Sequence, residues 1–196
     1  MPPRDVTGEL APVVPLVPPP VRRSTLVRAP LERTFDVFVT EIGAWWPVAP
    51  FSIGTDRVRD VTVDPRMGGV VVETWDDGST HTWGRMLAWD PPHGFTMSWT
   101  ITPEPTEVEL TFRSLAPSLT RVSVEHRGWE RMTEAQLEAA CALPGGYRGG
   151  AFVRGWGVVL DALARHAAGD ADADAGSAGD ATATAAGDAD AEGEER

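Results

Sequence analysis

The sequence predicts an α+β domain built from one strand, two short helices, six antiparallel strands and a long final helix. Two observations carry this prediction. Between residues 58 and 127, short segments with strand-like alternation follow one another, separated by breaks of Pro, Gly, Asp and Ser. Between residues 152 and 163, apolar side chains recur at helical spacing. Connections this short between strands favour antiparallel pairing.

The two ends of the 196-residue chain have biased compositions that set the predicted domain boundaries. Met1–Pro20 contains seven prolines, which favour an extended, disordered arm. Gly169–Arg196 carries nine acidic residues and one Arg but no large apolar side chain, so we expect a disordered acidic tail. The folded domain is predicted to span Val21–Ala168, and the two ends are expected to contribute little to its stability.

Composition also excludes several classes of function. The net charge of −12 falls mainly in the tail, and no basic surface suited to nucleic acid is visible. The single cysteine, Cys141, excludes an internal disulfide and a multi-cysteine zinc site. No apolar run approaches the ~18 residues of a membrane span. We expect a cytoplasmic protein without a membrane span, a metal or a cofactor; its oligomeric state is left open.

The first part of the predicted domain is a strand followed by helical segments. Val21–Arg28 has strand character and ends at Ala29-Pro30. Pro30 suits the first turn of a helix that continues to about Glu41, with an apolar stripe of Leu31, Phe35, Phe38 and Val39. Ile42–Pro50 is predicted to be a second short helix or a compact turn.

The remaining elements are six strands and two helices. The predicted strands are Val58–Val63, Val70–Trp75, His81–Trp89, Phe95–Ile101, Glu107–Arg113 and Arg121–Arg127. Thr133 and Gln136 form a capping-box pattern that opens a helix over Glu134–Leu143. The last helix, ending near Ala168, has an apolar stripe that only the strands offer enough surface to cover. The paired glycines on either side of Tyr147 suggest a flexible entrance beside a cavity.

Several strings in this order resemble a known superfamily. The segment from Arg28 to Phe35 resembles the start of START-like (SRPBCC) domains. It consists of a strand end, an Ala-Pro pair and a helix that carries an aromatic residue. Other strings resemble the branch related to the activator of heat shock protein 90 ATPase: Trp45-Trp46-Pro47, Asp64–Gly69, Gly84–Pro92, Phe95–Trp99, Glu125–Trp129 and Gly155-Trp156. The resemblance covers about residues 21–168. It implies a helix-grip fold, in which a curved sheet encloses a long helix and a cavity for a hydrophobic small molecule.

Strand alternation predicts which side chains face that cavity. Val122, Val124 and His126 should share the inward face of their strand. The segment 70–75 is ambiguous; if Val71 faces inward, so does Glu73, and across the next turn His81 and Trp83 join it. The predicted ligand-binding residues are therefore Glu73, Trp75, His81, Trp83, Met97, Trp99, Phe112, His126 and Trp156.

Glu73, His81 and His126 admit three interpretations. They could act as acid–base catalysts, bind a divalent metal, or hydrogen-bond within the protein and orient a ligand. Their spacing is not that of a metal site, and no nucleophile–base motif is present. We therefore expect a protein that binds a small hydrophobic or aromatic ligand. A co-chaperone-like module acting on the heat shock protein 90 ATPase and a cyclase- or hydrolase-type enzyme are the alternatives.

Overall fold

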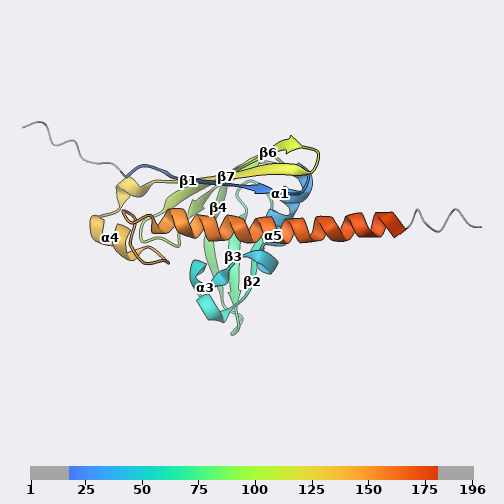
Figure 1. The fold of residues 1–196 in the computed structure, drawn as a ribbon. Coiled ribbons are helices and arrows are strands. Elements are labelled where there is room, and N and C mark those ends of the chain that lie inside the picture. The colour runs from blue at the N-terminus through green and yellow to red at the C-terminus, as the bar shows by residue number, and fades with distance from the viewer. Residues whose placement is uncertain (1–17, 181–196) are drawn as a thin grey trace, which may run out of the picture.

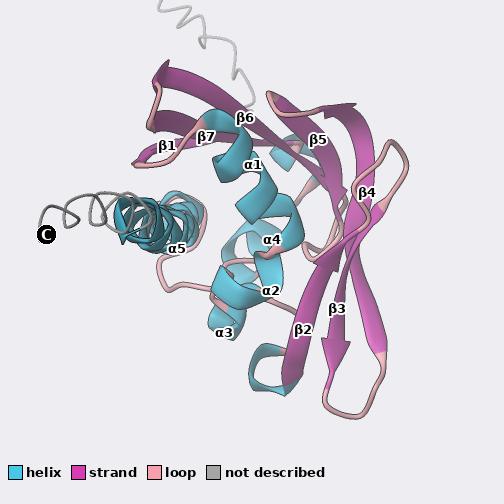
Figure 2. Ribbon diagram, turned by 90° about the vertical axis from the view of Figure 1, so that its right-hand side faces the viewer, coloured by secondary structure: helices cyan, strands magenta, loops and turns pink. Residues whose placement is uncertain are grey.

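A seven-stranded antiparallel sheet curls around a long helix in the computed structural model, which describes residues 18–180 and side chains as far as residue 169 (Figures 1 and 2). The strand order is β1-β7-β6-β5-β4-β3-β2, so the two edge strands are β1 and β2. Helices α1, α2 and α5 lie on the concave side of the sheet (Figure 2). The predicted helix-grip architecture is confirmed.

The strands are β1 (Val21–Val27), β2 (Val58–Val63), β3 (Val70–Trp75), β4 (Thr80–Asp90), β5 (Gly94–Trp99), β6 (Thr106–Ala116) and β7 (Leu119–Arg127). The helices are α1 (Leu31–Thr40), α2 (Ile42–Trp45), α3 (Val48–Phe51), α4 (Glu134–Ala139) and α5 (Ala151–Asp180), with 3-10 turns η1 (Thr55–Arg57) and η2 (Trp129–Arg131). All seven predicted strands are present, and the bounds of β2 and β3 are as predicted.

Two helical segments differ from the prediction. Residues 42–50 contain two short helices, α2 and α3, because Pro47 interrupts the helical hydrogen bonding after Trp46. The capping box at the start of α4 is confirmed, since the Gln136 amide donates to the Thr133 hydroxyl at 3.3 Å and the Thr133 amide to Gln136 Oε1 at 2.8 Å. However, α4 ends at Ala139, four residues early. Further along, Gly145 and Gly146 have φ angles of 100° and 58°, so the backbone cannot return to a helix there.

The ends of the domain extend slightly beyond the predicted boundaries. The described chain begins at Pro18, and the Pro19 carbonyl accepts a hydrogen bond from the Tyr147 hydroxyl. Helix α5 continues to Asp180 and projects past the sheet (Figure 1). Its last buried side chain among those described is Ala167. Residues 1–17 and 181–196 lie outside the described residues, so the disordered ends stay a prediction.

The core lies between the concave face of the sheet and the apolar stripe of α5. Val122, Val124 and His126 are each at most 2% exposed, so the predicted inward face of β7 is confirmed. Trp156, Val159, Leu160 and Leu163 of α5 are buried against it. At the α1 end the core is a cluster of phenylalanines, in which Phe112 contacts Phe35 and Phe38 edge-on. Phe112, a predicted ligand contact, is therefore a core residue in this cluster.

Two general features complete the description. Within residues 18–180, no helix combines the length and the apolar composition that a membrane span requires. In the same part of the chain, no three His, Cys, Asp or Glu side chains are grouped so that they could hold a metal ion.

Candidate functional site

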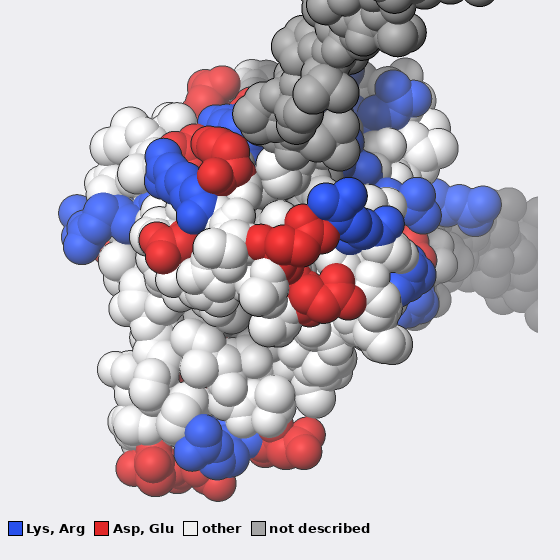
Figure 3. Space-filling model, turned by 90° about the vertical axis from the view of Figure 1, so that its left-hand side faces the viewer, with Lys and Arg blue, Asp and Glu red and all other residues white. Residues whose placement is uncertain are grey.

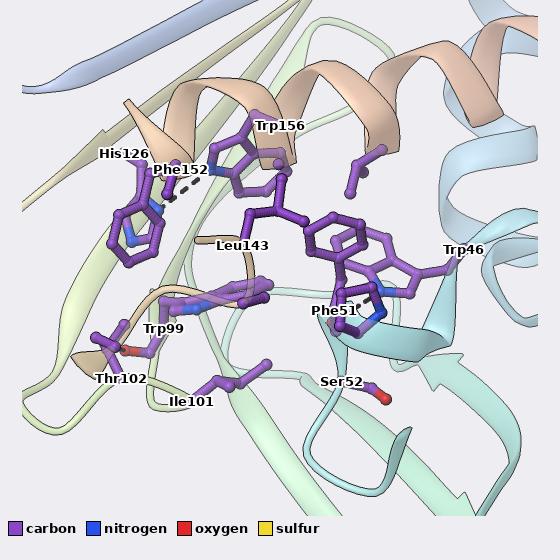
Figure 4. A pocket seen from close by; sticks show the side chains of 16 residues that line it. Trp46, Phe51, Ser52, Trp99, Ile101, Thr102, His126, Leu143, Phe152 and Trp156 are labelled. Atoms are coloured by element: carbon purple, nitrogen blue, oxygen red, sulfur yellow. Dashed lines mark hydrogen bonds between the residues drawn. The ribbon is translucent and has the colours of Figure 1, made fainter. Parts of the chain in front are cut away.

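An apolar pocket of about 90 Å³ lies between the end of β5 and the first turns of α5 (Figure 4). Its walls come from residues 46–52, residues 99–102, the segment 140–143 after α4, and the start of α5. Five aromatic side chains line it: Trp46, Phe51, Trp99, Phe152 and Trp156. Seen from the end of the molecule that carries α4, uncharged surface separates the charged residues above from those at the lower tip (Figure 3).

Three indole rings close the inner end of this pocket. The ring centroids of Trp46, Trp99 and Trp156 lie 5.8–6.2 Å from one another, so the rings are in mutual contact. Trp46 is also fixed by its indole N–H, which donates to the Phe51 carbonyl at 3.0 Å. Behind these rings, towards Trp83 and Met97, only about 10 Å³ of space remains. The interior between sheet and helix is therefore filled core, and the open volume lies at one end of it.

His126 forms part of the pocket wall and has both ring nitrogens hydrogen-bonded. The Trp156 indole N–H, which can only donate, lies 3.2 Å from Nδ1. Nδ1 must therefore be the acceptor, and Nε2 carries the proton that it donates to Thr106 Oγ1 at 2.8 Å. The ring is 1% exposed, and burial lowers the pKa of His126 from its usual 6.5 to about 3. It is a neutral imidazole at physiological pH.

This state of His126 predicts a pH-dependent stability. Between pH 6.5 and about 3 the unfolded chain binds a proton at His126 that the folded chain does not. The free energy of unfolding should therefore fall as the pH falls below 6.5, by up to about 1.4 kcal/mol per pH unit from this residue. Urea unfolding at pH 7.5, 6.0 and 5.0 measures the slope.

The controls are two histidine substitutions. His126→Gln should flatten the slope, whereas substitution of the exposed His93 by Gln should leave it unchanged. In the wild-type protein, NMR should show the His126 ring signals without titration down to pH 5. Titration of that ring near pH 6.5 would contradict a buried neutral imidazole.

Glu73 of β3 is fully buried, and its carboxylate accepts four N–H donors. The backbone amides of Ile53 and Gly54 donate at 3.0 and 2.7 Å, and the indole N–H groups of Trp75 and Trp83 donate at 2.5 and 2.7 Å. All four partners are N–H donors, and two of them are backbone amides of the segment after α3. Glu73 therefore anchors that segment to the sheet.

Trp75 and His81 form a separate, partly exposed cluster at the β3–β4 hairpin. Their rings stack at 3.7 Å, and the Arg57 guanidinium carbon lies 3.7 Å from the Trp75 ring centroid. Neither Trp75 nor His81 lines the pocket. The stacking of these two rings on each other explains their orientation, so no ligand is needed to explain it.

The predicted site residues are thus divided among several places. Trp99, His126 and Trp156 line the pocket, whereas Trp83 and Met97 line the small space behind it. Glu73, Trp75 and His81 belong to the hydrogen-bonded and stacked groups around β3. Glu73 and His126 share no hydrogen-bonding partner among the described residues, and the contacting rings of Trp83 and Trp99 connect them. No hydrogen bond joins any two of the three candidate acid–base groups, Glu73, His81 and His126, in the described part of the chain.

Of the sixteen residues that line the pocket, the sequence-based prediction included three, Trp99, His126 and Trp156. Trp46 and Gly155 enter the sequence analysis only as parts of the family resemblance, and Phe51 and Ser52 lie in a segment without periodicity. Small residues that leave space for the pocket, Ala140, Ala142, Ala151 and Gly155, are not among the predicted ligand-binding residues. A usable signal was present in α5, where Gly155 precedes Trp156 on the apolar stripe. A glycine on a face otherwise made of large apolar residues indicates space or close approach there.

Comparison with known proteins agrees with this geometry. The family model described as "Activator of Hsp90 ATPase homolog 1-like protein" matches residues 28–168. No curated protein matches the chain. Among solved structures, the self-sacrificing resistance protein CalC from Micromonospora echinospora is 25% identical, with a TM-score of 0.56 over 79% of this chain and 97% of that chain.

Two further structures extend the comparison. The anthrahydroquino-γ-pyrone synthase Txn09, complexed with SUM, is 31% identical over 72% of this chain and 97% of that chain, with a TM-score of 0.48. Protein CV1439 from Chromobacterium violaceum is 19% identical over 77% of this chain and 98% of that chain, with a TM-score of 0.51, and shows the fold alone. Since the family match spans nearly the whole sheet and α5 as far as residue 168, the chain belongs to the family of Activator of Hsp90 ATPase homolog 1-like proteins, within the START-like superfamily.

Proposed function

We propose that this protein binds a small hydrophobic or aromatic molecule in the pocket between β5, α3 and α5. The observation that carries the proposal is the wall of five aromatic side chains around open volume at one end of a filled core. Apolar, aromatic-lined concavities with a few polar groups are typical of small-molecule sites. At about 90 Å³, the volume is below the ~300–1,000 Å³ common for drug-sized ligands, which favours a ligand of one or two rings.

The geometry does not favour the catalytic alternative. A general base needs a free lone pair within reach of its substrate. Glu73 lies outside the pocket and accepts four hydrogen bonds, and both nitrogens of His126 are occupied. We propose no acid–base reaction for Glu73, His81 and His126. The co-chaperone alternative has its support in the family description, and the pocket does not bear on it.

A matched pair of glycine substitutions tests the pocket. Gly155 faces it, since a Cβ there would lie 3.1 Å from the Phe51 ring, whereas a Cβ on Gly157 would contact only the Arg23 side chain, at 3.5 Å or more. Both glycines are inside α5, so substitution by Leu changes helix propensity equally. Gly155→Leu should abolish binding of ethylbenzene or naphthalene, and Gly157→Leu should retain it.

Ligand-observed saturation-transfer NMR with the full-length protein measures this binding directly. We expect dissociation constants in the micromolar to millimolar range for such small probes, since their binding energy is limited by their size. Thermal melts of both variants establish that each is folded. The proposal fails if neither probe binds the wild-type protein, or if Gly155→Leu binds them as well as Gly157→Leu.

A further inference from the structure

The polar side chains in the pocket wall are satisfied within the protein. Ser52 Oγ donates to the Val48 carbonyl at 2.6 Å and accepts from the Thr55 amide at 3.1 Å. Thr102 Oγ1 donates to the Glu104 carbonyl at 2.9 Å and lies 3.2 Å from Thr106 Oγ1. His126 uses both ring nitrogens, as described above. The hydroxyl protons of Ser52 and Thr102 and both ring nitrogens of His126 are therefore engaged within the protein, which leaves these side chains no proton to donate to a ligand.

The pocket wall also carries no charge. Among the side chains described, no Asp, Glu or Arg lines it, and the titratable group that does, His126, is neutral. A charged ligand group placed here would lose its hydration without gaining an ion pair, which costs far more than burying a neutral group.

One polar group in the wall differs from the others. The indole N–H of Trp99 donates no hydrogen bond within residues 18–180, while the indole N–H groups of Trp46 and Trp156 both do. Trp99 is partly exposed at the end of β5 and contacts both of those rings. An indole nitrogen can only donate. Among the described side chains that line the pocket, the Trp99 indole thus offers an N–H donor that is not already used within the protein.

We infer that the ligand is a neutral aromatic molecule whose polar group is a hydrogen-bond acceptor, such as the carbonyl oxygen of an aromatic ketone or quinone, received by the Trp99 indole N–H. This inference rests on the proposed function, because it specifies the ligand class of the same pocket. It excludes ligands that carry a carboxylate or an alkylammonium group in the pocket.

Four probes of similar size separate these properties. Ethylbenzene is neutral without an acceptor, acetophenone adds a carbonyl, and benzoate and benzylammonium add opposite charges. Binding of each is measured by saturation-transfer NMR at pH 7.5. Ethylbenzene and acetophenone should bind, and both charged probes should bind at least about 100-fold more weakly, because neither charge finds a partner in the pocket.

The Trp99 assignment is tested by Trp99→Phe, which keeps an aromatic ring and removes the N–H. The affinity for acetophenone relative to ethylbenzene should fall roughly two- to tenfold, the usual value of one hydrogen bond. Trp89→Phe is the matched control, because Trp89 packs on Phe35 and Phe95, away from the pocket, and its indole also makes no hydrogen bond with described residues. That variant should leave the ratio unchanged.

The possible outcomes distinguish a failure of the inferred ligand class from a failure of the proposed ligand-binding function. If benzoate or benzylammonium binds within about threefold of ethylbenzene, the pocket binds ligands but the exclusion of charge is wrong. If the acetophenone-to-ethylbenzene ratio is the same in Trp99→Phe and the wild-type protein, Trp99 does not receive the carbonyl. If none of the four probes binds, the proposed function itself fails.

Discussion

Replacing Trp156 by alanine is expected to lower the free energy of unfolding by about 3–5 kcal/mol, the usual loss for a buried aromatic side chain. The Trp156 ring is 6% exposed and contacts both Trp46 and Trp99. Its indole N–H is also the donor to His126 Nδ1, so the alanine variant leaves a buried acceptor unsatisfied. A loss of this size approaches the whole stability of a typical small domain.

Urea unfolding followed by circular dichroism measures this change, and shortening the chain provides the comparison. For a chain restricted to residues 18–180, the free energy of unfolding should lie within about 1 kcal/mol of that of the full-length protein. The composition of the removed ends predicts that they contribute little apolar area, and their charges are screened by salt. Should the shortened chain lose as much stability as Trp156→Ala, the predicted domain boundaries would be wrong. Trp156→Phe should be intermediate, since it keeps most of the ring area and loses the hydrogen bond.

The sequence predicted the strands well because each has a two-residue period bounded by residues that break strands. The inward orientation of Glu73 followed from that period once Val71 was assumed to face inward. The structure confirms it, with both side chains at most 2% exposed. The orientation of His126 followed in the same way. Alternation alone therefore identified the buried polar side chain of β7, whereas in β3 it needed the assumption about Val71, and it did not anticipate the partial exposure of His81.

The partners of those side chains could not be predicted, because they depend on irregular segments. Glu73 is held by the amides of Ile53 and Gly54, about 20 residues away, in a turn whose path no periodicity reveals. The donor to His126, Trp156, comes from α5, 30 residues further along the chain. The function suggested for Glu73 therefore changed: without its partners it resembles an acid–base group, and with them it is a structural anchor.

This anchor gives the other large expected effect. Glu73→Ala should lower the free energy of unfolding by about 3–5 kcal/mol, because it removes the acceptor of several N–H donors, and each buried donor left unsatisfied costs about 1–3 kcal/mol. The Gly54 amide and the Trp83 indole would lose their acceptor where water has little access, whereas the donors of the more exposed Ile53 and Trp75 can bind water instead. Substitution of the exposed Glu130 by Ala is the control and should cost less than about 0.5 kcal/mol.

Glu73→Gln distinguishes an anchor from a catalytic group. The amide has nearly the shape of the carboxylate, and its oxygen can still accept hydrogen bonds. Its NH₂ group cannot accept hydrogen bonds from the N–H donors that it faces. Part of the stability should therefore be lost and part retained. Amide hydrogen exchange should quicken at Ile53 and Gly54 in both Glu73 variants. Since Phe51 and Ser52 immediately precede these amides and line the pocket, ethylbenzene should bind more weakly to Glu73→Gln than to the wild-type protein. Unchanged exchange at Ile53 and Gly54 would show that the carboxylate does not hold this segment. That result would contradict the expected coupling between Glu73 of β3 and the pocket wall.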